Sequence, residues 1–319
     1  MKNRATQLTL LLPALVAALC SCTRSATRVR LPSDLQADLR ENESQNDVVP
    51  VAVHGTEIQV FLTTGRRAVS ERMPYVLAVS ISPDGAKCAI VGVQDRSTVS
   101  FLDVDSGSVT GGLKISPHVW DGAISNQGAI AVTLDEGWGE SAREGPLVVF
   151  QPGSDGPIRV AAAGRSPSFP SDGGELVYED NGRIIVHSIS SKTGRAIASG
   201  MDPSVSPDGL RIAFRSADGY FHVVDRFGKQ DKRLVRSDGI VGRLSWDPSS
   251  EYLLYLRGLL GVWEAPLDIA RLEEMKKVIA IRCRDGRAGV LGGVPGYTSP
   301  ADFAWVKSRA LRLRAADVR

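Results

Sequence analysis

A short turn motif recurs along the chain and restricts its fold more than any other feature. The clearest copy is "SPDG" at 206–209, followed by "LRIAF", in which apolar residues alternate with others. Proline presets φ for a turn, aspartate hydrogen-bonds to nearby backbone and glycine accepts positive φ, while alternation with a period of two is typical of a strand. We interpret the residues of the two intact copies as structural rather than catalytic: Ser82, Pro83, Asp84, Gly85, Ser206, Pro207, Asp208 and Gly209.

The motif marks a longer repeat. Its copies read "SPDG", "SNQG", "PSDG", "SPDG" and "WDPSS" and begin roughly 35 to 46 residues apart, close to the length of a four-stranded propeller blade. Residues 48–69 lack the first strand of a copy, and the alternation of Phe303 and Trp305 within 299–308 indicates where that strand lies. The repeat therefore predicts an all-β, six-bladed β-propeller over 48–308. Its last blade would be closed by N- and C-terminal strands, which removes the open sheet edges.

The stretch "SVSPDGLRIAFRSADGYFHVVDRFG" at 204–228 resembles the repeat of the TolB-like β-propellers, whose blades carry "W-S-P-D-G-x-x-I-A-F". The match is good at 80–90 and degenerate in the other copies. The resemblance implies a propeller, a cell-envelope location and binding of protein partners. TolB has an α/β domain ahead of its propeller, for which this chain has no room, so the resemblance does not imply membership of the Tol–Pal machinery. Related propellers cover prolyl oligopeptidase-type peptidases, which need an α/β-hydrolase domain that is not found here.

The first residues are typical of an export signal. Residues 1–21 have a charged start, an apolar run at 8–19 and then small residues, as a secretory signal peptide does, and the run is shorter than the ~20 residues of a spanning helix. The letters "LCSC" at 19–22 resemble the bacterial lipoprotein signal box, which implies lipid attachment at Cys22. The alternatives are an uncleaved anchor, ordinary signal-peptidase cleavage and a poorly supported Cys-x-Cys metal site.

The segments outside the repeat are polar or basic. Residues 22–47 are charged and poor in aromatics, which predicts a flexible tether. Residues 309–319 form a basic tail, either a solvated end or a contact with anionic lipid. Within the fifth blade, apolar residues at helical spacing in 267–278 predict a short inserted helix before the last strand. The net charge of +2 gives no indication of nucleic-acid binding.

The sequence shows no local catalytic motif. It contains no Gly-x-Ser-x-Gly elbow and no phosphate-binding glycine loop, so we predict no catalytic residues, no metal site and no cofactor. His187 and His222 lie in equivalent predicted strands, where a structural role is favoured over a metal site. Cys88 and Cys283 are expected as buried thiols, although a disulfide between them stays open.

One loop is the best candidate for a partner site. The segment "LDEGWGESAREGP" at 134–146 is the longest insertion within a clear blade. Extra loop length on a rigid scaffold is often used for binding, and tryptophan is enriched at interface hot spots. The candidate residues are Asp135, Glu136, Trp138 and Glu140. The acidic residues of this loop, like Asp103 and Asp105, are interpreted as solvated turns, with a calcium site as the alternative.

Three functions remain open from the sequence. The favoured hypothesis is a non-enzymatic binding scaffold, exported and lipid-anchored on the periplasmic or extracellular face of a membrane, with an envelope protein or a wall component as partner. The second is a propeller hydrolase or lyase whose residues converge from several blades at the central channel. The third is a sensor for a small ligand in that channel. Carboxylates or histidines that converge at the channel mouth would favour the second.

Overall fold

The computed structural model describes residues 48–54, 57–62, 65–70, 76–92, 98–103, 108–115, 118–135, 145–237, 243–247, 249–257, 276–294 and 303–307. Within these ranges all regular secondary structure is β, and every strand pair is antiparallel. No helix in the described part of the chain has the length and apolar character to cross a membrane. The chain is therefore an all-β protein, as the repeat predicts.

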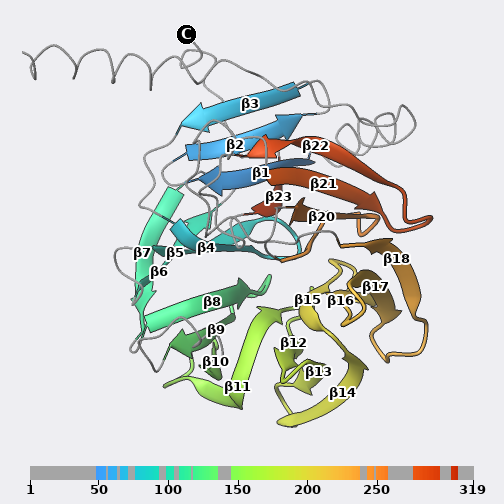
Figure 1. Cartoon of the computed structure of the whole chain (residues 1–319). Coiled ribbons are helices and arrows are strands. Elements are labelled where there is room, and N and C mark those ends of the chain that lie inside the picture. Colours follow the sequence, from blue (N-terminus) through green and yellow to red (C-terminus); the bar gives the residue numbers. More distant parts are fainter. Residues whose placement is uncertain are drawn as a thin grey trace, which may run out of the picture.

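The strands form a series of hydrogen-bonded sheets (Figure 1). The sheet that joins both ends of the described chain runs β23 (Phe303–Lys307), β1 (Val48–His54), β2 (Glu57–Leu62), β3 (Gly65–Ser70). The next runs β4 (Val76–Ile81), β5 (Lys87–Gly92), β6 (Thr98–Asp103), β7 (Ser108–Lys114). Towards the C-terminus lie the sheet of β15 (Met201–Val205), β16 (Arg211–Arg215), β17 (Tyr220–Asp225), β18 (Lys232–Arg236) and the sheet of β19 (Ser245–Trp246), β20 (Tyr252–Arg257), β21 (Lys276–Arg282), β22 (Ala288–Val294).

The remaining sheet is continuous because one long strand serves two groups. It contains β8 (His118–Ile124), β9 (Ile130–Asp135), β10 (Gly145–Phe150), β11 (Ile158–Ser168), β12 (Glu175–Asp180), β13 (Arg183–Ser188) and β14 (Thr193–Ser199). The first part of β11 pairs with β10, at Leu147↔Ala161, and its end pairs with β12, at Ser168↔Val177. Strand β11 is thus the last strand of one group and the first strand of the next.

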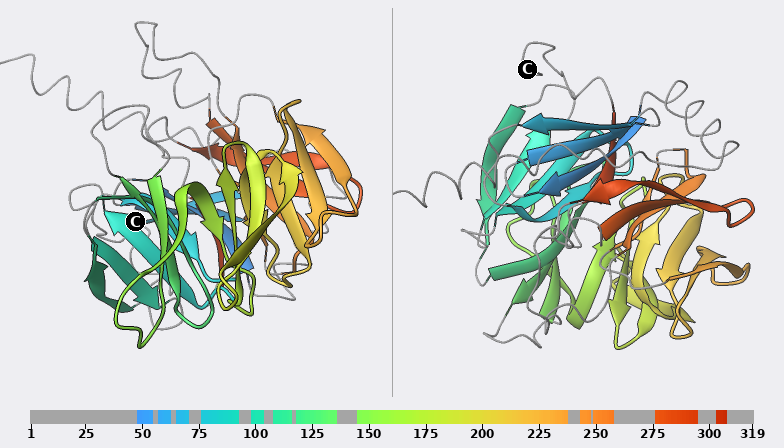
Figure 2. Two further views of the ribbon diagram at one scale, coloured as in Figure 1. Left: turned by 90° about the horizontal axis from the view of Figure 1, so that it is seen from below. Right: turned by 45° about the horizontal axis from the view of Figure 1, so that its top comes forward.

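The first strands of the groups meet in a closed series. Contacts run from β4 to β8, β8 to β11, β11 to β15, β15 to β19, β19 to β23 and from β23 back to β4. Figures 1 and 2 show the strand groups following one another around a common centre. The predicted pairing of 299–308 with the N-terminal strands is present, since Trp305 pairs with Pro50 across β23 and β1.

The core lies between neighbouring sheets rather than inside one of them. Adjacent residues of β12 illustrate this, because Leu176 packs with β9 and β10 while Val177 packs with β15 and β16. The equivalent pair in β16 repeats it, with Ile212 facing the sheet before and Ala213 the sheet after. Side chains alternate across a strand, so each sheet is apolar on both faces.

One predicted element is wrong at its end. The helical spacing over 267–278 does not continue to its end, because Lys276, Lys277 and Val278 belong to β21. This strand is followed by β22, so the last two strands of its sheet both come after the predicted insertion. Residues 258–275, which contain the rest of that prediction, lie outside the described residues.

Candidate functional site

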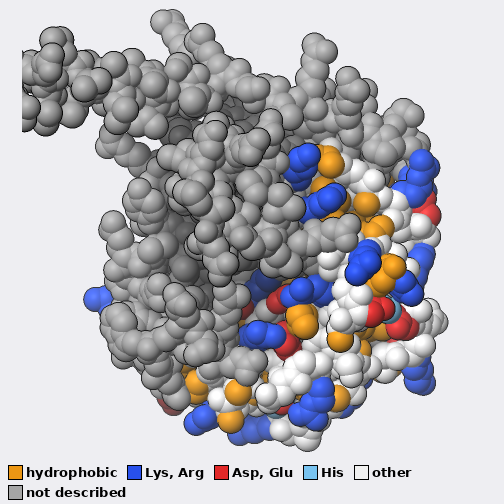
Figure 3. All heavy atoms as spheres, viewed as in Figure 1, with side chains coloured by type: hydrophobic (Ala, Val, Ile, Leu, Met, Phe, Trp, Pro, Cys, Tyr) orange, Lys and Arg blue, Asp and Glu red, His pale blue; other side chains and the backbone are white. Residues whose placement is uncertain are grey.

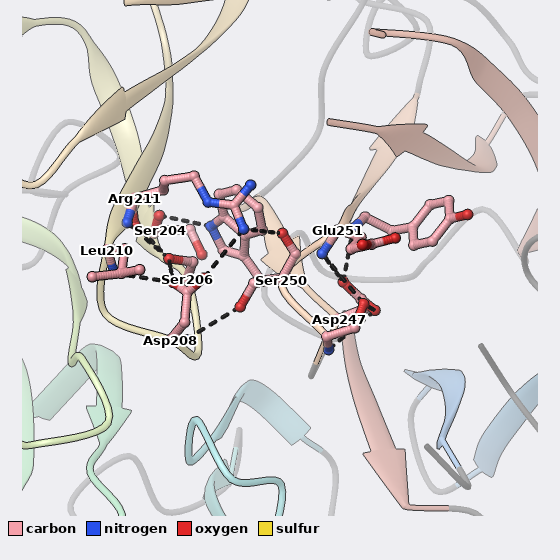
Figure 4. A network of polar contacts seen from close by, with 11 residues as sticks. Ser204, Ser206, Asp208, Leu210, Arg211, Asp247, Ser250 and Glu251 are labelled. Atoms are coloured by element: carbon pink, nitrogen blue, oxygen red, sulfur yellow. Dashed lines mark hydrogen bonds and ion pairs between the residues drawn. The ribbon is translucent and has the colours of Figure 1, made fainter. Parts of the chain in front are cut away.

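The two intact turns have the same internal hydrogen bonds. At 206–209 the Ser206 hydroxyl donates to Asp208 Oδ1 at 2.5 Å and accepts from Arg211 N at 2.9 Å (Figure 4). Asp208 Oδ1 also accepts from Leu210 N at 3.0 Å, and Gly209 has φ 71°. Partial burial alone would raise the pKa of Asp208, but the hydrogen bonds from Ser206, Leu210 and Arg211 outweigh it and lower the pKa. Asp208 is therefore fixed as an ionised acceptor within its own turn.

Two other copies keep this geometry, one with the same residues and one with a different residue at the serine position. In the earlier intact copy Ser82 Oγ donates to Asp84 at 2.6 Å and accepts from Lys87 N at 2.9 Å. In the last copy Asp247 replaces the serine, and its Oδ1 accepts from the backbone of Glu251 and Tyr252 at 2.8 and 2.7 Å. In each of these turns a side-chain oxygen accepts a backbone N–H group of the same segment.

Three of the turns form a hydrogen bond to the next one along the series. Asp84 N donates to Asn126 Oδ1 at 3.0 Å, and Gln127 Nε2 donates to Ser171 O at 3.3 Å. Further on, Asp208 N donates to Ser250 Oγ at 3.2 Å (Figure 4). The turns therefore join neighbouring sheets at one end of the molecule.

A second repeated position lies at the other end of the first strands. Counted four residues back from Ser125, Pro170, Ser206 and Asp247, the equivalent turn residues, the last four copies carry Asp121, Ser166, Asp202 and Arg243. These four residues meet although they are far apart in the sequence. Together with the partners Arg165, Glu179 and Arg215 we call them the inner-strand cluster.

Contacts between the four repeat positions cross from strand to strand. Arg243 forms an ion pair with Asp121, 122 residues away, and donates to Gly122 O at 3.1 Å. Ser166 N donates to Asp121 Oδ2 at 3.0 Å, and Ser166 Oγ donates to Asp202 Oδ1 at 3.3 Å. The cluster thus links β8, β11 and β15 to the residue that leads into β19.

The remaining members neutralise the other carboxylates. Arg215 pairs with Asp202 at 3.1 Å, and Arg165 pairs with Glu179, which is fully buried. Asp202 N donates to the second oxygen of Glu179 at 3.1 Å. Each carboxylate of the cluster therefore has its own arginine partner, and each of its oxygens accepts at least one hydrogen bond.

Irregular strand pairing places these side chains. The register shifts at the repeat position in every one of these first strands: between Val119 and Asp121, between Arg165 and Ser168, and between Met201 and Ser204. Ser166 and Asp202 have φ 52° and 54°, the left-handed region. A bulge redirects a side chain and is common beside functional sites. Residues with strained backbone also cluster at functional sites. The bulges bring the repeat position into the cluster.

Burial dominates the electrostatics of the cluster. Burial raises the pKa of Asp121 above its ordinary value, and the charge of Arg243 and the hydrogen bonds from Ser166 N and Gly122 N oppose this only in part. The chemistry that such an arrangement supports is charge pairing between strands. A general base needs a carboxylate that is open to a substrate proton, and here the carboxylate oxygens are engaged by protein donors.

The sequence-predicted sites are distributed differently. Asp135 ends β9, whereas Glu136, Trp138 and Glu140 lie outside the described residues, as do Cys22 and Asp105. His187 and His222 lie in equivalent strands but two positions apart in register, since His187 pairs with Leu176 and His222 with Phe214. Within the described part of the chain no three His, Cys, Asp or Glu residues group as metal ligands.

The two histidines and Cys283 have separate surroundings. His187 is buried, which lowers its pKa, while His222 Nδ1 lies 2.7 Å from Asp231 Oδ1. Cys283 is a free, buried thiol, so it does not pair with Cys88, and burial raises its pKa from 9.0 to about 12. Cys88 lies in β5, the strand expected for it.

The inner-strand cluster was not predicted from the sequence. The signal that would have found it is the alignment of the repeats by their turns, followed by a comparison of the position four residues earlier. In the last four copies that position reads Asp, Ser, Asp, Arg, whereas the turns themselves keep small and polar residues.

Comparison with solved structures shows the fold. The chain is similar to the crystal structure of TolB from Acinetobacter baumannii, with a TM-score of 0.58 and 14% identity over 81% of this chain and 66% of that one. It is also similar to the putative TolB from Agrobacterium tumefaciens, with a TM-score of 0.55 and 17% identity over 81% of this chain and 96% of that one. The sequence matches no family model and no curated protein. The chain has a TolB-like β-propeller fold.

Proposed function

We propose that this protein is an exported cell-envelope lipoprotein whose propeller binds a protein partner or a wall component and catalyses no reaction. The observation that carries the non-enzymatic part is the occupation of the carboxylates in the inner-strand cluster. Asp121, Glu179 and Asp202 converge from different strands, but each is paired with an arginine. Acids fixed in this way hold strands together and leave binding to the outer surfaces.

The scaffold of this proposal is a propeller of six blades over 48–308. The closed series of first-strand contacts supports this number, because β4, β8, β11, β15, β19 and β23 each begin a group of four strands. The pairing of β23 with β1 supports closure of the last blade by both ends of the chain. A closed ring is stable without open edges and presents rigid loops at its surface.

The location in this proposal follows from the N-terminal sequence. Residues 1–21 act as the signal peptide, Cys22 carries the acyl chains and 22–47 form the tether, with 309–319 as a basic tail. More than one acyl chain gives stable anchoring. The propeller then lies on the periplasmic or extracellular side of the membrane, where the family resemblance implies protein partners.

Lipid attachment is tested by metabolic labelling with a fatty-acid analogue. The Cys22→Ala chain should lose the label and move from the membrane to the soluble fraction, while Cys20→Ala, the matched control two residues away, should keep both properties. Label that persists in the Cys22→Ala chain would contradict the anchor.

The partner surface of the proposal is the loop with Asp135, Glu136, Trp138 and Glu140. It is tested by cross-linking the full-length protein in its own envelope and comparing Trp138→Ala with Asp155→Ala, an exposed residue in the next turn of the same strand group. Loss of a cross-linked partner with Trp138→Ala alone supports the loop. Equal capture of the partner by both variants would show that the partner surface is not this loop.

One observation favours a second candidate, a small-ligand or catalytic site at the channel. Three carboxylates do converge on the first strands, which is the arrangement that such a site needs. The two candidates differ in the effect of Asp202→Asn. If the protein is a scaffold, Asp202→Asn changes stability and leaves partner capture by the folded protein unchanged. If the channel holds a site, the same variant abolishes binding of the small ligand or substrate.

A further inference from the structure

Two large apolar side chains in the described part of the chain are exposed, and they belong to adjacent turns. Leu210 is 60% exposed and Phe227 is 62% exposed. Leu210 follows the turn between β15 and β16, and Phe227 lies in the turn between β17 and β18. The two turns are joined by a hydrogen bond from Arg226 N to Leu210 O at 3.0 Å. Both side chains therefore project from the same end of one strand group.

The turn that carries Phe227 is held rigidly. Asp225 Oδ1 accepts from Phe227 N and Lys229 N, both at 2.9 Å, and the hydrogen bond from Lys229 N is the largest of the contributions that lower the pKa of Asp225. Gly228 has φ 77°, and a Cβ there would lie 2.6 Å from Ile197 O in β14. The close contact with β14 explains the glycine, and the fixed turn keeps the Phe227 ring out in solvent.

Cations surround the Phe227 ring. The guanidinium carbons of Arg195 and Arg226 lie 5.6 and 5.8 Å from the ring centroid. Arg195 donates to Arg226 O at 2.7 Å rather than to a carboxylate, and the exposed Lys229 follows two residues after the ring. On the face drawn in Figure 3, Lys and Arg side chains lie beside apolar ones in the region of β15–β18, with Asp and Glu side chains among them.

Several carboxylates on the same end accept hydrogen bonds within the fold, although their side chains are partly exposed. Asp172, Asp208 and Asp225 each accept hydrogen bonds from the backbone of their own turn. Glu175 pairs with Arg226 at 2.7 Å. Their charges are thus partly satisfied by the fold, whereas the side chains of Arg195, Lys229 and the exposed Lys192 reach into solvent.

We propose that this end of the strand group, the Phe227 surface formed by Leu210, Phe227, Arg195, Arg226 and Lys229, docks on an anionic phospholipid bilayer. Isolated apolar side chains ringed by Lys and Arg match an interface in which the apolar groups enter the headgroup region and the cations contact phosphates. Two separate side chains on turn tips offer far less apolar area than the ~800 Å² per partner of a stable protein interface.

The proposed anchor makes such a weak contact effective. In a chain attached at Cys22, a tether of 26 residues has a root-mean-square span of roughly 30 Å, so the propeller stays close to the bilayer and the second contact is effectively intramolecular. This argument rests on the proposed lipoprotein function, whereas the test below does not.

The test measures contact at a defined position. The full chain carrying Cys22→Ala is used throughout, so that no acyl group contributes, and brominated phosphatidylcholine in phosphatidylglycerol vesicles quenches any tryptophan that enters the headgroup region. Phe227→Trp keeps the aromatic contact with both arginines. Tyr220→Trp is the matched control, because Tyr220 begins β17 at its opposite end and stacks on Arg233 at 3.4 Å.

We expect the tryptophan at 227 to be quenched and that at 220 to resemble the parent chain. Lys229→Gln should weaken the vesicle binding reported by the 227 probe about fivefold, and Arg236→Gln, at the far end of β18, should leave it unchanged. An unquenched 227 probe, or equal quenching at both positions, would overturn the proposal. So would quenching that is as strong in pure phosphatidylcholine, or a 227 probe that responds to soluble polyglutamate and not to vesicles.

Discussion

The turn at the start of each repeat and the strand position four residues before it follow opposite rules. The turns repeat one solution, in which Ser82, Ser206 and, in a different form, Asp247 accept backbone N–H groups of their own segment. The earlier position changes from copy to copy, and its side chains pair with residues of other copies, as Asp121 does with Arg243. The side chain at the turn position mainly stabilises its own turn, whereas the side chains at the earlier position link one copy to another.

The largest expected effect comes from removing the arginine of the inner-strand cluster. Arg243→Met leaves Asp121 largely buried without its ion pair, and loss of one partner of a buried pair costs about 3–5 kcal/mol of unfolding free energy. Urea denaturation of the folded chain measures it. Arg211→Met is the matched control in the turn, because its pair with Asp208 is about one-third exposed and contributes about 1 kcal/mol or less. Equal losses of unfolding free energy for the two variants would mean that the cluster position and the turn position contribute alike to stability.

A smaller effect is expected in the turn itself. Ser206→Ala removes a fully buried hydroxyl and leaves Arg211 N without its acceptor, for a loss of about 1–2 kcal/mol. Ser216→Ala is the control, since Ser216 makes a similar contact to Asp218 at the exposed hairpin of β16 and β17. Its loss should be below about 1 kcal/mol. A larger loss at Ser216 would mean that burial does not determine how much the turn serine contributes to the unfolding free energy.

The last effect is absent at neutral pH and appears only at alkaline pH. The pKa of Cys283 is raised from 9.0 to about 12 in the folded state by burial, so its contribution to stability is complete below pH 9. It falls as the pH rises through that interval, by about 1.4 kcal/mol per unit. Cys283→Ala should lack this component. Denaturation curves between pH 8 and 10.5 compare the two slopes, and parallel slopes would contradict the burial of the thiol.

The turns and the strands that follow them could be predicted because their information is local. The residues of 206–211 satisfy one another within six positions, and alternation marks β16 and β17 directly. Strand β21 was missed for a physical reason. Val278, Ile279, Ala280 and Ile281 are all buried, because the strand is covered on both faces, and a continuous apolar run carries no alternation to distinguish it from a helix.

The inner-strand cluster could not be predicted from any one segment. Asp121, Ser166 and Arg243 meet across 45 to 122 residues of sequence, and the bulges that turn their side chains inward leave no local motif. Only the ring arrangement of the first strands brings these positions together. The Phe227 surface could not be predicted from the sequence either. "RFG" is an ordinary turn sequence, and only the structure shows that Arg195 of β14 lies over the Phe227 ring.

The most direct test of this ring arrangement is a double-mutant cycle between Asp121 and Arg243. The unfolding free energies of Asp121→Asn, Arg243→Met and the double variant give their coupling energy. We predict a coupling of about 2 kcal/mol or more, because residues that share one ion pair do not act independently. Additive losses, with a coupling below about 0.5 kcal/mol, would show that these residues do not meet and would contradict the closed series of first strands.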